Sequence, residues 1–279
     1  MNKKEFNSFF KIHSQNVDNS NKLGFWELTD RILKTYLLEN IPRRENVTIV
    51  DFGGGTGRWL LMLDQYFRNS KFIIVDLSED MLSQAKKKVS DGLYRNQVDL
   101  ISGDITDVSH LCDGIADYVI STYNPISFVK DPQCVVNEAF RILKHDGKAL
   151  ITVQGYYNAL YSKINNSLAD SKELNEIYNK KKVKWNNSVP KLWQLSKNDM
   201  ESMFVKSGFS EVISRGIACV TQPQGEDFDP ENKQLGPLSK KLNEDSLFYD
   251  TLFNIELKTG EDQNAVDRGM NILTIGRKL

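Results

Sequence analysis

Four of the 17 glycines in the chain lie within five residues, starting two residues after an acidic residue. Residues 50–57 read Val-Asp-Phe-Gly-Gly-Gly-Thr-Gly, in which the acidic residue is Asp51. Glycines permit positive φ angles and let a ligand approach the backbone closely. The carboxylate of Asp51 would repel a phosphate and attract an ammonium or a sulfonium group. The segment therefore predicts a tight turn that binds a cationic ligand.

Two phosphate-binding patterns that also use glycines do not fit this segment. A P-loop ends in Gly-Lys-Ser or Gly-Lys-Thr, whereas Gly57 is followed by Arg58 and Trp59. A dinucleotide fingerprint needs a third glycine at position 58, which is Arg58. The pattern Asp-x-Gly-x-Gly-x-Gly fits throughout, and S-adenosylmethionine (SAM) carries an ammonium and a sulfonium but no phosphate. Asp76, 23 residues after Gly53, is placed to accept hydrogen bonds from ribose hydroxyls.

The elements that must position these residues alternate between strand and helix patterns. Short β-branched runs predict five strands, at residues 47–50, 72–75, 98–101, 118–122 and 149–153. Helical periodicity fills the segments between them, and Ser78 and Asp131 stand where helix N-caps are expected. This alternation predicts right-handed crossovers and a parallel sheet with helices on both faces.

The flanks of this region predict a lid and a cap. Residues 1–46 are expected to be largely helical and form an N-terminal lid on a domain of residues 47–279. Residues 155–195 are aromatic, polar and irregular, and too long for a simple loop, so they predict a substrate cap inserted after the fifth strand. Residues 223–236 predict a surface excursion, and residues 238–257 predict a helix.

Residues 45–155 resemble the class I SAM-dependent methyltransferases. The matching pieces are the glycine segment, Ile-Val-Asp-Leu-Ser at 74–78, Ser-Gly-Asp-Ile at 102–105 and Leu-Lys-His-Asp-Gly at 143–147. The ending, residues 271–278, is similar to the last, antiparallel strand of that fold. The resemblance implies a three-layer α-β-α fold with a doubly wound, mostly parallel seven-stranded sheet. It also implies methyl transfer from SAM, with S-adenosylhomocysteine (SAH) as the product.

The resemblance further implies cofactor contacts, residue by residue. They are Asp51, Gly53 and Gly55 for the methionine moiety, Asp76 for the ribose, Leu77 and Met81 against the adenine, Asp104 and Ile105 at the adenine edge, and Tyr123 and Asn124 facing the methionine end and the substrate. Most of these positions follow the carboxyl ends of predicted strands, where open α/β sheets bind ligands.

Methyl transfer from a sulfonium mainly needs alignment of the reactants, and a general base only when the nucleophile arrives protonated. Candidate bases are His13, Tyr123 and Tyr156, with Tyr157 beside the last. His13 lies in a stretch, residues 9–26, that could close over SAM, although a surface or capping role is the alternative. Tyr156 could equally be a packing residue. Two tryptophans of the predicted cap, at 185 and 193, could line the acceptor pocket or belong to the core.

Composition narrows the expected partners. The 36 Lys and Arg nearly balance the 37 Asp and Glu, so the basic footprint of a dedicated nucleic-acid binder is missing. No apolar stretch approaches the roughly 20 residues that span a bilayer, and the N-terminus lacks a secretory signal. We therefore expect a cytoplasmic protein with three reduced cysteines and neither a nucleic-acid nor a membrane partner. Its oligomeric state is open.

The expected activity is methyl transfer to N or O of a small molecule or a small peptide-derived product. A metal is not expected, because residues 121–124 offer no acidic ligands after the fourth strand. Carbon also remains open as the acceptor atom.

Three alternatives remain. Asn124 begins Asn-Pro-Ile-Ser, half of the Asn-Pro-Pro-aromatic motif of enzymes that methylate planar amides or exocyclic amines, so a nucleic-acid or protein N-methyltransferase is one. A SAM-binding module without activity is another. An NAD-linked dehydrogenase is the third, and Arg58 disfavours it.

Overall fold

The computed structural model describes residues 3–15, 17–22, 24–166, 169–228 and 235–279. A seven-stranded sheet with the order β3-β2-β1-β4-β5-β9-β8 runs through its centre. The strands are β1 (Thr48–Phe52), β2 (Lys71–Asp76), β3 (Gln97–Ser102), β4 (Ala116–Ser121), β5 (Leu143–Gln154), β8 (Ser210–Ile217) and β9 (Asn271–Arg277). Only β9 runs antiparallel to its neighbours, β5 and β8. The predicted doubly wound, mostly parallel sheet with an antiparallel last strand is confirmed.

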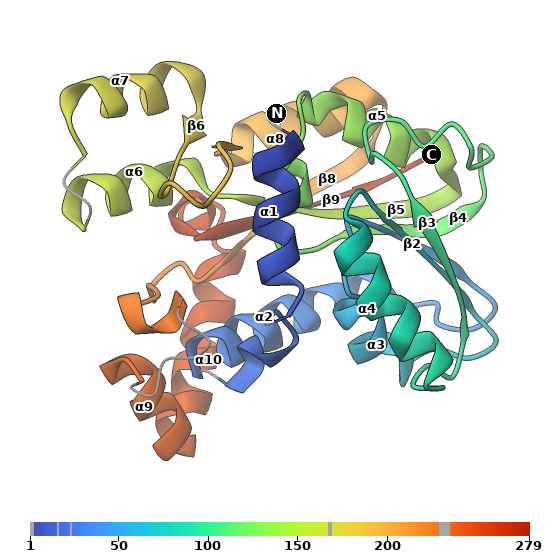
Figure 1. Cartoon of the computed structure of the whole chain (residues 1–279), viewed down its shortest axis with the longest axis horizontal. Helices are drawn as coiled ribbons and strands as arrows, with labels where there is room; N and C mark the ends of the chain where they lie inside the picture. Colours follow the sequence, from blue (N-terminus) through green and yellow to red (C-terminus); the bar gives the residue numbers. More distant parts are fainter. Residues whose placement is uncertain (1–2, 16, 23, 167–168, 229–234) are drawn as a thin grey trace.

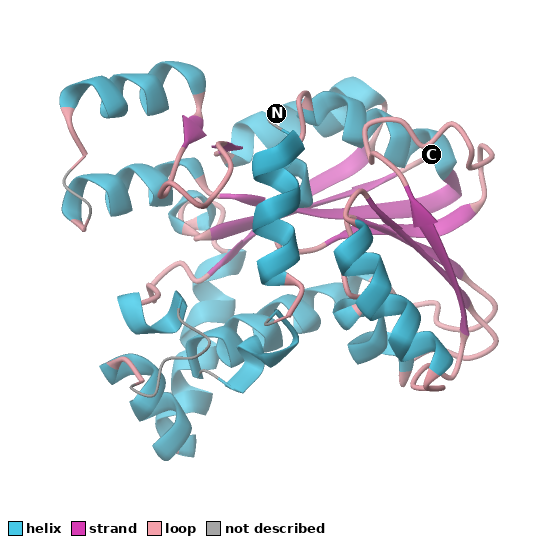
Figure 2. Ribbon diagram, in the orientation of Figure 1, coloured by secondary structure: helices cyan, strands magenta, loops and turns pink. Residues whose placement is uncertain are grey.

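Helices cover both faces of the sheet (Figures 1 and 2). One face packs against α2 (Gly24–Asn40), α3 (Arg58–Asp64), α4 (Glu79–Ser90) and α10 (Ser246–Glu261). The other face packs against α5 (Pro132–Ile142) and α8 (Lys197–Ser207). Successive strand residues alternate between these two cores, as Ile49 and Val50 do, because side chains of a strand point alternately to its two faces. The three-layer architecture follows directly from this alternation.

The predicted helix starts are confirmed. Ser78 and Asp131 cap α4 and α5, because their side chains accept hydrogen bonds from the backbone N–H groups of Met81 and Gln133. Ser196 and Asp199 form a capping box that begins α8. Each cap places the loop that precedes its helix at the carboxyl edge of the sheet.

One expectation about the second half of the chain was wrong. Residues 155–195 are not irregular: they form α6 (Tyr156–Asn165), α7 (Ser171–Lys180) and a small antiparallel pair, β6 (Lys182–Val183) with β7 (Leu192–Trp193). The helical prediction for residues 238–257 is confirmed, and the segment is divided into two helices, since α9 (Pro237–Glu244) ends before α10 begins. Asp245 separates them, since its side chain caps α10 by accepting from the backbone N–H of Phe248. The predicted excursion contains η3 (Gly225–Phe228), and residues 229–234 lie outside the described residues.

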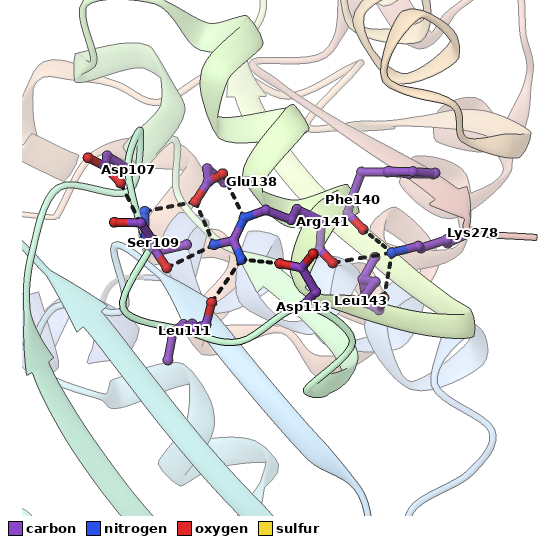
Figure 3. A network of polar contacts seen from close by, with 10 residues as sticks. Asp107, Ser109, Leu111, Asp113, Glu138, Phe140, Arg141, Leu143 and Lys278 are labelled. Carbon is purple, nitrogen blue, oxygen red and sulfur yellow. Dashed lines mark hydrogen bonds and ion pairs between the residues drawn. The ribbon is translucent and has the colours of Figure 1, made fainter.

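The loop between β3 and β4 is tied to the end of α5 (Figure 3). The Arg141 guanidinium donates to the backbone oxygens of Val108 (2.9 Å) and Leu111 (2.8 Å). Glu138 accepts from the backbone N–H of Val108 at 2.9 Å and from Arg141. Lys278 donates to three backbone oxygens at the same helix end. These contacts fix a loop that begins with the two residues expected at the adenine edge.

The first 46 residues pack against two different parts of the fold. Helix α2 packs its apolar stripe, which includes Leu28, Ile32 and Tyr36, into the core on the sheet. Helix α1 (Lys3–His13), followed by the 3-10 helix η1 (Val17–Lys22), lies against α4 and between α4 and the cap (Figure 1). Among the described residues, no helix has both the length and the apolar character needed to cross a membrane.

Candidate cofactor and active site

The glycine turn after β1 adopts the conformation that its sequence requires. Gly53, Gly55 and Gly57 have φ angles of 71°, 57° and 72°. A Cβ atom on Gly53 would lie 2.3 Å from the Cβ of Pro125, which belongs to the loop after β4. At Gly55, by contrast, nothing lies closer to such an atom than 3.6 Å. The turn therefore needs glycine for its backbone at each position and for close packing at Gly53.

Asp51 is fully buried at the end of β1, and neither carboxylate oxygen has a hydrogen-bond partner among the described residues. Burial, with a smaller contribution from the charge of Asp76, raises the pKa of Asp51 to about 8. A buried carboxylate without a partner is costly, and a cationic group beside it would offset that cost. This is the environment that an ammonium-bearing ligand fits.

Asp76 lies at the end of the adjacent strand, β2. Its oxygens accept hydrogen bonds from the backbone N–H groups of Gly55 (2.9 Å) and Ser78 (2.8 Å). Burial raises its pKa to about 6, and these hydrogen bonds oppose that shift. The Sδ of Met81 is the atom nearest to a Cβ built on Gly55. Asp76 and Met81 thus stand on the side of the turn where ribose and adenine contacts are expected.

The remaining expected adenine contacts lie beside this strand. Leu77 directly follows Asp76 and is half-buried. Gly103, whose backbone N–H donates to the Asp76 carbonyl at 3.0 Å, precedes Asp104 and Ile105. Asp104 is exposed and accepts from the backbone and hydroxyl of Thr106. Ile105 is buried. The two loops therefore lie side by side at the same edge of the sheet.

Tyr123 and Asn124 follow β4 in a strained backbone conformation, with φ angles of 56° and 72°. The Asn124 side chain donates to Asn271 Oδ1 at 2.7 Å, and its backbone N–H donates to Thr152 at 3.1 Å. The Asn124 Oδ1 atom is buried without a partner among the described residues. Asn124 therefore combines a strained backbone with a buried acceptor atom that has no partner among the described residues.

The Tyr123 hydroxyl is fixed by a polar network that the sequence did not reveal. It donates to Asp30 Oδ1 at 2.6 Å and shares a hydrogen bond with Thr29 at 3.0 Å. Asp30 also forms a buried ion pair with Arg58. Burial and the charge of Asp30 raise the pKa of Tyr123 well above its usual value. The hydroxyl therefore stays protonated, which favours a positioning role over a base role.

His13 ends α1 beside an aromatic cluster. Its ring stacks on Phe9 with the centroids 5.5 Å apart, and both Phe9 and Phe10 contact Phe128, in the loop after β4. His13 is exposed, and desolvation by the surrounding protein lowers its pKa. The imidazole is therefore neutral at neutral pH and able to accept a proton.

Tyr156 lies elsewhere. It is buried in a small cluster of the cap with Ala159, Ile177 and Val183, and its hydroxyl donates to the Tyr178 carbonyl at 3.4 Å. Within the described ranges, no hydrogen bond or ring contact joins Tyr156 to the other two candidate bases. The geometry thus favours packing for Tyr156.

Four neutral side chains gather where β4 and β5 end and β9 begins, and we call them the amide cluster: Asn124, Gln154, Gln194 and Asn271. Gln154 pairs in register with Asn271. Gln154 Oε1 accepts from the indole N–H of Trp185 (3.1 Å) and from Gln194 Nε2 (2.7 Å). Gln194 is fully buried, and its Oε1 has no partner among the residues described. Neither glutamine was found from the sequence, because isolated glutamines carry no motif.

The second cap tryptophan, Trp193, donates to the Val129 carbonyl at 3.1 Å and packs against the core of the α5 face. Within the part of the chain that the structure describes, no group of three or more His, Cys, Asp or Glu side chains could hold a metal ion.

Comparisons with known proteins agree with this geometry. Residues 49–147 match a family model described as a methyltransferase domain. A rice protein (Oryza sativa subsp. japonica) named 2-methyl-6-phytyl-1,4-hydroquinone methyltransferase 1 is 30% identical over 53% of this chain and 43% of its own length. The ubiquinone/menaquinone biosynthesis C-methyltransferase UbiE of Rickettsia typhi is 26% identical over 68% of this chain and 80% of its own. The chain spans less than half the length of the plant relatives that it matches.

Solved structures share the fold. Haemonchus contortus phosphoethanolamine N-methyltransferase 2, solved in complex with SAM, has a TM-score of 0.54 to this chain at 18% sequence identity. The match covers 88% of this chain and 52% of that one.

Proposed function

We propose, from the premise that residues 49–147 form a class I SAM-dependent methyltransferase domain, that the chain transfers a methyl group from SAM to an N or O atom of a small uncharged molecule. The observation that carries the proposal is the buried carboxylate of Asp51 beside a glycine turn, which no described residue pairs with. Such a carboxylate discriminates in favour of a cation and against the phosphates of a dinucleotide.

The residues at the turn fit the cofactor. Bound SAM supplies a methyl group on a positively charged sulfur, from which a neutral thioether leaves. Asp51 would bind the ammonium group, and Asp76 would exchange a backbone hydrogen bond for ribose hydroxyls. Met81 would pack against the adenine. The work of the protein is then to hold the acceptor in line, which can contribute several kcal/mol to catalysis.

The amide cluster supports an uncharged acceptor that carries hydrogen-bond donors. Its two unpartnered atoms, Asn124 Oδ1 and Gln194 Oε1, are acceptors, so they fit a hydroxyl or an amine N–H. The cluster itself contains no charged side chain that would pair with an anionic group. A neutral alcohol, phenol or amine is therefore favoured over a phosphorylated acceptor.

A hydroxyl or a neutral amine must lose a proton as it is methylated, and His13 is the best-placed base of the three candidates. Its lowered pKa leaves it neutral, and its aromatic neighbours reach Phe128 in the loop that follows Tyr123 and Asn124. His13 would accept the acceptor's proton at an imidazole nitrogen.

A second candidate is methylation of a ring carbon in a hydroquinone. The names of the rice and Rickettsia relatives favour it. The same hydrogen-bond acceptors would bind the ring hydroxyls, whose deprotonation makes the ring carbon nucleophilic. The two candidates differ in the atom that carries the methyl group and in the proton lost: after attack by the ring carbon, its C–H proton must also leave for the ring to become aromatic again.

Two measurements test the proposal. Isothermal titration should detect SAH binding to the wild-type chain, and no binding at millimolar SAH would refute it. Incubation of the protein and deuterated-methyl SAM with a small-molecule extract should then yield a labelled product, whose mass spectrum distinguishes O, N and C methylation. Parallel incubations with bulk RNA and with protein test the nucleic-acid and protein alternatives. The cytoplasmic location and the domain boundaries at residues 46 and 47 remain predictions.

A further inference from the structure

Asp18, in η1, contacts the glycine turn directly. Its Oδ1 accepts from the hydroxyl of Thr56 at 2.7 Å, and its Oδ2 pairs with the Nζ of Lys88 at 2.6 Å. Lys88 Nζ also donates to the backbone oxygen of Thr56 at 2.9 Å. The three side chains thus close a ring of contacts that joins the N-terminal segment, the glycine turn and the last turn of α4.

This ring of contacts is partly shielded from water. Thr56 is buried, and the side chains of Lys88 and Asp18 are 14% and 35% exposed. An ion pair in such a position is screened less than one on the open surface, and the hydroxyl bond adds to it. We call the contacts among Asp18, Thr56 and Lys88 the latch.

The rest of the N-terminal segment (α1 and η1) is held at two more points. Near its start, Glu5 pairs with Lys184 of the cap at 2.8 Å. Midway, Phe9 and Phe10 contact Phe128. In Figure 1 the helix lies between α4 and the cap. The segment therefore reaches from the cap, past the loop after β4, to the glycine turn, and it touches two of the loops that carry expected cofactor contacts, those after β1 and β4.

Thr56 makes the latch sensitive to the state of the turn. It lies between Gly55 and Gly57, whose backbone conformations define the turn, and both its hydroxyl and its carbonyl belong to the latch. A ligand that orders the turn would also hold Thr56 in the geometry that Asp18 and Lys88 need. Conversely, the segment cannot lift away from the turn without breaking the ion pair.

We propose that Asp18 is a positioning residue whose latch to Thr56 and Lys88 holds the N-terminal segment over the cofactor site and slows the release of SAH. This inference rests on the proposed function, because it takes SAM and SAH as the ligands of the turn. It adds that cofactor exchange requires the latch to open.

The test compares SAH dissociation from the wild type and from Asp18→Asn by stopped-flow tryptophan fluorescence. Asparagine can still accept from Thr56 but no longer pairs with Lys88. The expected result is a dissociation rate faster by about 3- to 10-fold, which is the size of effect for one partly exposed ion pair. Added salt should speed SAH release from the wild type more than from Asp18→Asn, because salt screens only the charged latch.

Controls separate the latch from a general loss of stability. Asp99→Asn breaks a Lys–Asp pair of similar length, Lys71–Asp99 at 2.7 Å, at the sheet edge, and should leave SAH dissociation unchanged. Lys88→Gln should reproduce the Asp18→Asn effect. If Asp18→Asn releases SAH at the wild-type rate with the wild-type salt dependence, the latch is refuted. If the wild type itself binds no SAH, the proposed function fails instead.

Discussion

The carboxylates of Asp51 and Asp76 lie at the carboxyl ends of adjacent parallel strands, and among the described residues only that of Asp76 has hydrogen-bond partners. Burial and, to a smaller extent, the charge of Asp76 raise the electrostatic cost of ionising Asp51, which is fully buried. At neutral pH the pair therefore holds its full negative charge only when a cation lies beside it. The carboxylate of Asp51 is unfavourable in the apo protein, and the relief of this cost by a cation adds to the affinity for a cationic cofactor.

Replacing Asp51 with Asn should weaken cofactor binding and strengthen the fold. The amide cannot balance the ammonium of SAH, so the Kd measured by calorimetry should rise at least about tenfold, as for a lost charge-assisted hydrogen bond. The apo protein should resist urea better than the wild type above neutral pH, because the buried unpaired charge is gone. Equal SAH affinity in both proteins would contradict this role of Asp51.

The stability of the apo protein should fall as the pH rises from about 4 to about 8. The pKa of Asp51 is about 8 in the folded chain, far above its unfolded value, so the folded state keeps a proton that the unfolded state releases. A raised pKa contributes stability at low pH that is lost as the pH rises through the folded value. Asp76, with a pKa of about 6, contributes the earlier part of the decline. Urea unfolding across this range should give a flatter profile for Asp51→Asn.

The titration of Asp51 should also make SAH binding depend on pH. Since a cation stabilises the ionised form of Asp51, SAH binding near pH 7 should release a proton and tighten as the pH rises. Calorimetry in two buffers with different ionisation enthalpies measures that proton. An identical binding enthalpy in both buffers would rule out a titration of Asp51 on binding.

Gly53→Ala should damage the turn more than an otherwise similar glycine substitution. The φ of Gly53 is +71°, and a Cβ would lie 2.3 Å from Pro125. Gly92 provides the matched control, because its φ is +69° and nothing lies within 4 Å of its Cβ position. Both variants carry backbone strain of about 1 kcal/mol. Only Gly53→Ala should also lose SAH affinity, and equal melting temperatures for the two would contradict the packing argument.

Local patterns determined the parts of the fold that were predicted correctly. Strand runs, N-caps such as Ser78 and the glycine turn are readable because each depends on neighbours in the sequence. The cap was misjudged because the exposed face of α6 carries large side chains, Tyr157, Tyr161 and Ile164, which obscure the apolar periodicity expected of a helix. The break before α10 had a readable signal, the N-cap residue Asp245, that was overlooked.

The site residues that could not be predicted from the sequence are held by contacts between distant parts of the chain. Asp30 meets Arg58 and Tyr123 across 28 and 93 residues of chain, and Asp18 meets Thr56 across 38. Single acidic residues of this kind resemble ordinary surface residues until the fold brings their partners to them. The sequence showed Arg58 only as a departure from a dinucleotide motif, whereas in the structure it balances a buried carboxylate.

Asp30→Ala should be the most destabilising change in the site. The side chains of Asp30 and Arg58 are only 7% and 13% exposed, so removing the carboxylate leaves a buried guanidinium unpaired, at a cost of about 3–5 kcal/mol. Asp250→Ala removes the partner of Arg31 in an exposed pair, where Asp250 is 60% exposed, and should cost less than about 1 kcal/mol. Urea unfolding compares the two. Similar losses would show that Asp30 is not the buried anchor.

Tyr123→Phe tests whether the Tyr123 hydroxyl only stabilises the network with Asp30 and Arg58 or also acts as a general base. Asp30 keeps its ion pair with Arg58 in this variant, so only the hydrogen bonds of the phenol are lost, and stability should fall by about 1 kcal/mol. Because the pKa of Tyr123 lies well above its usual value, the hydroxyl holds its proton at working pH. Methyl transfer under saturating SAM should therefore drop by less than about tenfold, whereas loss of a general base typically costs about 100-fold or more. A collapse of the rate with unchanged SAH affinity would make Tyr123 the base and displace His13 from that role.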